Sequence, residues 1–174
     1  IYRFSKNQDP NLEFDLTSNG NFNASYPEVN MKMNIAIADL QKLNFNNTPL
    51  KFRGEFDVKM TSASVDHLNG ILTAKNLLLV NEKGQFPLDS IHITATSTAE
   101  KNTLQLQSQF IKANVFGKYQ LNEIVPAITN SINKYYAVQP ATTIKTKPQN
   151  FNFDVTISED PIIMKLISEI KQVE

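Results

Sequence analysis

Apolar and polar residues alternate along most of the chain, a pattern typical of β-strands with one dry and one wet face. Every odd position from 29 to 37 is large and apolar, namely Val29, Met31, Met33, Ile35 and Ile37. The segment 50–60 is more regular, because Leu50, Phe52, Phe56, Val58 and Met60 alternate with five charged residues. Charged side chains must meet water. Each segment therefore predicts a strand with one apolar face.

Weaker copies of the alternation predict about ten to twelve strands in all. Their apolar positions are Tyr2 and Phe4; Leu12, Phe14 and Leu16; Phe22, Ala24 and Tyr26; Leu72 and Ala74; Ile91, Ile93 and Ala95; Leu104, Leu106 and Phe110; Ala113, Val115, Gly117 and Tyr119; Phe151, Phe153, Val155 and Ile157. Turn-forming residues at 18–21, 69–70, 82–84 and 99–102 predict short hairpins between them. We expect a mainly all-β antiparallel meander that forms one long curved sheet.

Two segments follow helical spacing instead. Apolar residues within 122–136 predict a short amphipathic helix, and Asp160 with Pro161 predicts the start of a second helix up to the C-terminus. The Pro- and Thr-containing segment 137–150 has no periodicity and is expected to be a linker or surface loop.

A short internal repeat suggests how the chain is organised. The residues Leu12 to Thr17 and Phe151 to Thr156 share the order apolar, any, Phe, Asp, apolar, Thr. The chain also begins with Ile1, with neither an initiator Met nor a signal peptide. We expect a unit at 1–136, a linker at 137–150, and at 151–174 the strand and helix that open a next repeat within a longer protein.

Composition excludes several functions. The 174 residues carry 17 basic and 17 acidic side chains without long runs of one sign, which disfavours nucleic-acid binding. With no Cys and two His, neither a metal site nor a cofactor is expected. With five Gly, no nucleotide-binding fingerprint is present.

No catalytic motif emerges, so we expect a protein that is not an enzyme. Asp66 and His67 are adjacent and point in different directions on an extended chain, which does not suit a catalytic triad with Ser62 or Ser64. Glu55 and Asp57 alternate with basic residues and read as a solvated charge ladder.

The apolar faces are the remaining candidate site, and two interpretations are open. They form the core of a closed sandwich, or they line the trough of one long sheet and bind an apolar ligand.

A resemblance favours the trough. The segments Gly54 to Ser62, Leu68 to Leu77, Pro87 to Ile91, Leu104 to Phe110 and Ala113 to Tyr119 resemble the AsmA-like periplasmic proteins of Gram-negative bacteria, the family that includes TamB. The similar part spans about residues 50 to 136, and residues 151–166 resemble the start of the family's next unit. The family's N-terminal anchor helix and C-terminal domain have no counterpart here.

The resemblance implies a curled β-sheet trough that carries phospholipid between the inner and outer membranes. It also implies a periplasmic location within a longer, inner-membrane-anchored protein, and a link to outer-membrane protein assembly through a barrel partner of the TamA type. The acyl chains are expected to contact Val29, Met31, Met33, Ile35, Ile37, Leu50, Phe52, Phe56, Val58, Met60, Leu104, Leu106 and Phe110. The alternative is an extracellular β-sandwich binding module of the carbohydrate-binding or adhesin type, which would use exposed rings such as Tyr26, Tyr135 or Tyr136.

Overall fold

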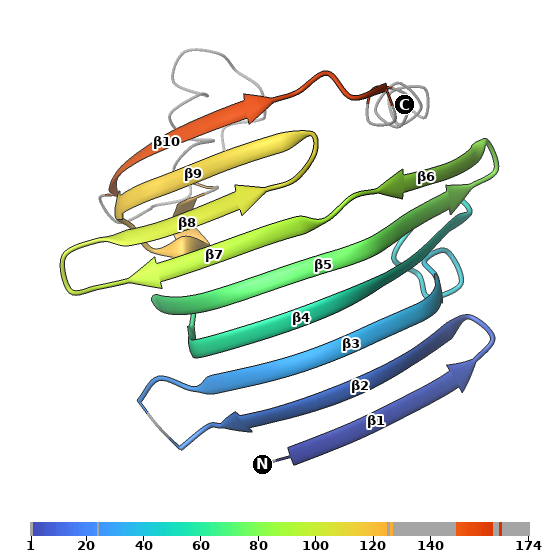
Figure 1. Ribbon diagram of the computed structural model, residues 1–174, viewed down its shortest axis with the longest axis horizontal. Coiled ribbons are helices and arrows are strands. Elements are labelled where there is room, and N and C mark those ends of the chain that lie inside the picture. Colours follow the sequence, from blue (N-terminus) through green and yellow to red (C-terminus); the bar gives the residue numbers. More distant parts are fainter. Residues whose placement is uncertain (1, 24, 125, 127–148, 162–163, 165–174) are drawn as a thin grey trace.

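The computed structural model, which describes residues 2–23, 25–124, 126, 149–161 and 164, is one open antiparallel sheet of ten strands (Figure 1). The strands are β1 (Tyr2–Asp9), β2 (Leu12–Asn21), β3 (Glu28–Asp39), β4 (Leu50–Ser64), β5 (His67–Asn81), β6 (Gly84–Leu88), β7 (Ile91–Ser97), β8 (Asn102–Gln107), β9 (Ile111–Lys118) and β10 (Asn150–Ile157). They lie side by side in the order β1-β2-β3-β4-β5-β7-β8-β9-β10, and β6 also pairs with β5. The predicted meander, its strand number and its open form are confirmed.

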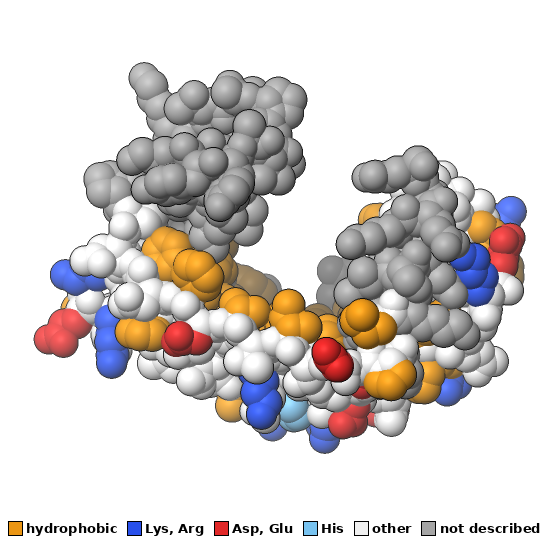
Figure 2. Space-filling view, turned by 90° about the horizontal axis from the view of Figure 1, so that it is seen from above, with side chains coloured by type: hydrophobic (Ala, Val, Ile, Leu, Met, Phe, Trp, Pro, Cys, Tyr) orange, Lys and Arg blue, Asp and Glu red, His pale blue; other side chains and the backbone are white. Residues whose placement is uncertain are grey.

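The sheet is curved and its two faces differ. Figure 2 looks along the sheet from the β10 side and shows hydrophobic side chains on the floor of a hollow, with charged side chains gathered on the opposite, convex surface. Alternation explains the separation, because successive side chains of a strand point to opposite faces. We call the two surfaces the apolar concave face and the polar convex face.

Few of the described hydrophobic side chains are buried. They are Ala38, Val58, Ala74, Leu77, Phe86, Ala95 and Ile124. A closed sandwich of this length would bury most of its inward-facing residues between two layers. The predicted alternative of a sandwich core does not describe this sheet.

Two predicted hairpin turns are wrong, and two are right. The residues at 18–21 continue β2, so that the chain leaves the sheet after Asn21. Gly70 lies inside β5, whose hairpin with β4 turns at Val65 and Asp66. The strand predicted through Phe22, Ala24 and Tyr26 is not formed at Phe22 and Tyr26, which lie in the connection to β3 with exposed rings, and Ala24 lies outside the described residues. The turns at 82–84 and 99–102 are confirmed. The short strand β6, which contains Pro87, was not predicted.

The helical predictions fall mostly outside the described residues. Residues 121–124 and Pro126 are helical, and the rest of the predicted helix to 136 lies outside the described part, as do Tyr135 and Tyr136. At the second site the Met164 amide donates to the Asp160 carbonyl at 2.8 Å, the spacing of one helical turn that begins at Pro161. Within the described helical residues, no helix is long and apolar enough to span a membrane.

The strand β10 belongs to the same sheet as the rest. It pairs with β9 over its whole length, from Asn150 opposite Lys118 to Ile157 opposite Ile111. The division of the chain at 137–150 into units stays a prediction.

Candidate functional site: the apolar concave face

The apolar concave face is built from rows of side chains that run across the strands. In an antiparallel sheet, residues directly opposite each other share a face and have neighbouring Cβ atoms. One row joins Leu16, Met33, Phe56, Ala74 and Ile91. A second row joins Met31, Val58, Leu72, Ile93, Leu106, Ala113 and Val155. A third joins Val29, Met60, Gly70, Ala95, Leu104, Val115 and Phe153.

Most large side chains in these rows are partly buried. These partly buried side chains include Met31, Met33, Phe56, Met60, Leu72 and Ile93. Val58, in the second row, is more buried, with 8% exposure. Side chains in this state retain contact with water along one surface. Among the described residues, the rows therefore form an extended apolar surface that is in partial contact with water.

Glycine makes room for a bulky neighbour within the face. A Cβ atom on Gly54 would lie 2.6 Å from Leu77 Cδ2 and 3.1 Å from Phe52 Cζ. The Phe52 and Phe56 rings lie on either side of this position, with centroids 6.0 Å apart. Leu77 therefore packs down onto β4 between two rings, and it is 5% exposed.

Eleven of the thirteen predicted lining residues lie at concave positions of their strands, as judged from their cross-strand partners. Leu50 and Phe52 lie opposite Asn81 and Leu79 of β5, and Leu104 and Leu106 lie opposite Ala95 and Ile93 of β7. Ile35 lies opposite Gly54. The remaining two positions, Ile37 and Phe110, are exceptions.

Ile37 is displaced by a β-bulge. The register of β2 and β3 shifts between Phe14, opposite Ile35, and Glu13, opposite Ile37. The extra residue, Ala36, reverses the alternation, so Ala38 takes the concave position opposite Phe52 and is 3% exposed. By this register Ile37 shares a side with Glu13 rather than with the predicted lining residues.

Phe110 lies in the connection between β8 and β9 rather than in a strand. Its carbonyl accepts a hydrogen bond from the Ser158 amide at 2.9 Å. Its side chain is partly buried, but the strand alternation does not extend to it.

The concave face becomes polar at β1. Ser5 lies opposite Leu16, Asn7 opposite Phe14 and Asp9 opposite Leu12. The apolar residue Phe4 lies opposite Thr17 on the convex side and is 65% exposed. The predicted apolar alternation of β1 is thus inverted, and the apolar surface ends at β2.

The start of the helix lies over the concave face near β7 and β8. Leu121 lines a small gap together with Leu68, Ala95, Leu104 and Tyr119. Ile124 is 7% exposed. The described start of this segment therefore lies over one end of the apolar rows.

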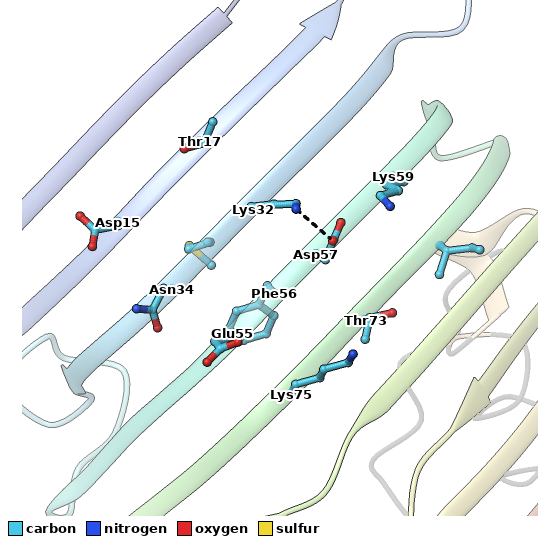
Figure 3. A pocket seen from close by; sticks show the side chains of 12 residues that line it. Asp15, Thr17, Lys32, Asn34, Glu55, Phe56, Asp57, Lys59, Thr73 and Lys75 are labelled. Atoms are coloured by element: carbon cyan, nitrogen blue, oxygen red, sulfur yellow. Dashed lines mark ion pairs between the residues drawn. The ribbon is translucent and has the colours of Figure 1, made fainter.

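The polar convex face carries a shallow depression of about 650 Å³ (Figure 3). Two of its carboxylates, Glu55 and Asp57, have partners on neighbouring strands. The Lys32 ammonium lies 3.9 Å from Asp57 Oδ2, and Asn76 Nδ2 donates to Glu55 Oε1 at 2.9 Å. The carboxylates that sequence analysis assigned to a charge ladder therefore have cross-strand partners.

Both histidine rings contact a neighbouring side chain. His67 stacks on Tyr26 with ring centroids 4.2 Å apart, and Ser62 donates to the backbone carbonyl of His67 rather than to its ring. His92 Nδ1 lies 3.3 Å from Thr73 Oγ1 on the convex face. Among the described residues no group of three or more His, Cys, Asp and Glu side chains is placed to hold a metal ion.

Comparisons of the chain with models of known protein families, with curated proteins and with solved structures find no match.

Proposed function

We propose that the apolar concave face binds the acyl chains of phospholipids. The observation that carries the proposal is the set of apolar rows that cross the open sheet while their large side chains keep partial contact with water. An extended apolar surface of this kind favours a ligand that is itself extended and apolar.

The energetics fit a lipid chain. Each CH₂ group removed from water contributes about 0.8 kcal/mol, so a row of apolar side chains stabilises a chain laid along it. Met31, Met33 and Met60 on neighbouring strands add adaptable surface, because the unbranched thioether fills irregular space. The backbone polar groups of interior strands are paired in the ladder, so they do not compete for the ligand.

The exposed charges of the convex face also support the proposal. Lys51, Arg53, Glu55 and Lys59 are exposed there, on the strand that contributes Phe56 to the lining. A single strand can thus keep the protein in water and present an apolar surface inward.

The resemblance to the AsmA-like family supports a cellular role. On that basis we propose that the chain is a segment of a periplasmic trough that carries phospholipid between the inner and outer membranes. The same resemblance supports a function in binding rather than catalysis, with a TamA-type barrel as a further partner through other regions.

Lipid extraction tests the proposal. Mass spectrometry of the purified protein is expected to find phospholipid in the wild type and little in Phe56→Arg, because a charge among acyl chains costs several kcal/mol, about 3 or more. Glu55→Arg is the matched control, since it adds the same side chain one residue away on the convex face.

Circular dichroism separates loss of lipid from loss of fold. Retained β-structure in Phe56→Arg with loss of lipid supports the proposal. A wild type that never yields lipid, with a Phe56→Arg variant that unfolds, would identify an ordinary hydrophobic core. Binding of soluble glycans without lipid would instead favour the extracellular binding module.

A further inference from the structure

The residues that follow β9 are attached to the sheet by polar contacts. The Asn102 side-chain amide donates to the Tyr119 carbonyl at 2.9 Å. The Gln149 side chain accepts a hydrogen bond from the Gln120 amide at 2.8 Å and donates one to Glu123 Oε2 at 2.9 Å. Because Asn102 begins β8 and Gln149 precedes β10, these contacts hold the start of the helix against the sheet.

Leu121 is the apolar residue of this segment that lies over the third row. It lines one small gap together with Ala95 and Leu104, which are opposite each other in that row. The gap has a volume of about 10 Å³, which is room for one water molecule at most. Ala95 is only 5% exposed. An acyl chain therefore has no space on the third row at β7 and β8 while Leu121 stays in place.

The neighbouring second row is not part of this gap. Its residues on the same two strands are Ile93 and Leu106, and neither of them lines the gap. Alternate residues of a strand lie about 7 Å apart, so the two rows are separate paths across the sheet. Leu106 is partly buried and keeps contact with water.

The apolar surface formed by the described strands is therefore wider at β4 than at β8. Strand β4 presents Phe56, Val58 and Met60, one in each row. The first row ends at Ile91 of β7, and at β8 Leu121 occupies the space over the third row. One row, at Leu106, is left at β8.

We propose that Leu121 determines which part of the concave face a lipid can use, so that acyl chains cross β7 and β8 on the second row and are excluded from the third. This inference rests on the proposed function, because it concerns the same apolar face. The two acyl chains of a phospholipid have neighbouring rows available at β4. At β8 they have one row between them, which makes this strand a constriction set by the start of the helix.

Nuclear magnetic resonance tests the path without a bulky probe. The 174-residue protein is deuterated except for its Leu and Met methyl groups and is mixed with protonated diheptanoylphosphatidylcholine below its critical micelle concentration. Methyl groups of Leu72 and Leu106 in the second row, and of Met60 in the third row away from Leu121, are expected to show nuclear Overhauser effects to acyl CH₂ protons. Those of Leu104 are expected to show none.

Two variants remove the cover in different ways. Leu121→Ala shortens the side chain over the gap, and Leu104 is expected to gain Overhauser effects to the lipid. Gln149→Ala removes the contacts to Gln120 and Glu123 without changing any residue of the three rows, and the same gain is expected. Leu121→Met is the matched control, because it keeps a side chain of similar volume and is expected to leave Leu104 without contact to the lipid.

The Overhauser effect between the Leu104 and Leu121 methyl groups reports the cover in the wild type, and its loss in Gln149→Ala shows that the start of the helix has moved. Lipid contacts of Leu104 that are equal in the wild type and both cover-removing variants, or absent from all three, would overturn the proposal. So would a silent Leu106 in a protein whose Leu72 and Met60 contact the lipid. Absence of lipid contacts at all four residues in every protein would contradict the proposed function itself, so the two failures are distinguishable.

Discussion

Gly54 and Leu77 are in direct contact on the apolar concave face, where the leucine side chain occupies the space that any larger residue at position 54 would need. Gly54 is therefore required by packing rather than by backbone conformation. The contact lies where the pairing of β4 with β5 shifts register, between Arg53 and Glu55 of β4.

Substitution Gly54→Val is expected to destabilise the protein by about 1–3 kcal/mol, because the added methyl groups must displace Leu77 or Phe52. The midpoint of urea unfolding measures the effect. Arg53→Ala, on the exposed convex side of the same strand, is the control and is expected to change stability by less than about 0.5 kcal/mol. Equal effects of the two substitutions would show that Leu77 does not pack against Gly54.

The ion pair between Lys32 and Asp57 is expected to contribute little. The Lys32 side chain is 74% exposed and the Asp57 side chain 40%, and exposed pairs of this kind are screened by water and salt. A double-mutant cycle with Lys32→Ala and Asp57→Ala is expected to give a coupling free energy below about 0.5 kcal/mol. A larger coupling, of about 2 kcal/mol or more, would mean that this face is covered rather than solvated.

Burial raises the pKa of Tyr119 above its ordinary value of about 10. Its ring meets Phe151 edge-on with centroids 6.0 Å apart, and folding favours the neutral phenol. The contribution to stability is therefore fully present below about pH 10 and is lost as the pH rises through the higher folded pKa.

Ultraviolet absorbance measures this ionisation directly. Tyr119→Phe is expected to remove a late phase from the tyrosinate titration and to reduce the loss of stability above pH 10. If the titration of the variant retains the same late phase, the environment assigned to Tyr119 is wrong.

Alternation along the chain was sufficient to predict the open antiparallel sheet and, along most strands, which residues share a face. It was insufficient wherever the register depends on a neighbour. Ala36 looks like any small residue in the sequence, yet as a bulge it turns Ile37 toward the convex face. Phe4 alternates correctly within β1, but pairing with β2 places it on the polar side.

Glycine positions were the least reliable guide to where the turns lie. Gly20 and Gly70 resemble turn residues, and both lie within long strands. Gly70 lies opposite Met60, one residue from a register shift, with a φ angle of 148°. Which glycines form turns and which allow bulges depends on long-range pairing, and the local sequence does not contain that information.

Site-specific photo-crosslinking tests the central claim most directly, because adjacent residues on one strand face opposite sides of the sheet. Crosslinkers at Met33 and Phe56 are expected to capture phospholipid acyl chains, whereas crosslinkers at the neighbouring Asn34 and Glu55 are expected to capture none. Lipid captured from Asn34 and Glu55 but not from Met33 and Phe56 would contradict the assignment of the concave face as the lipid-binding surface.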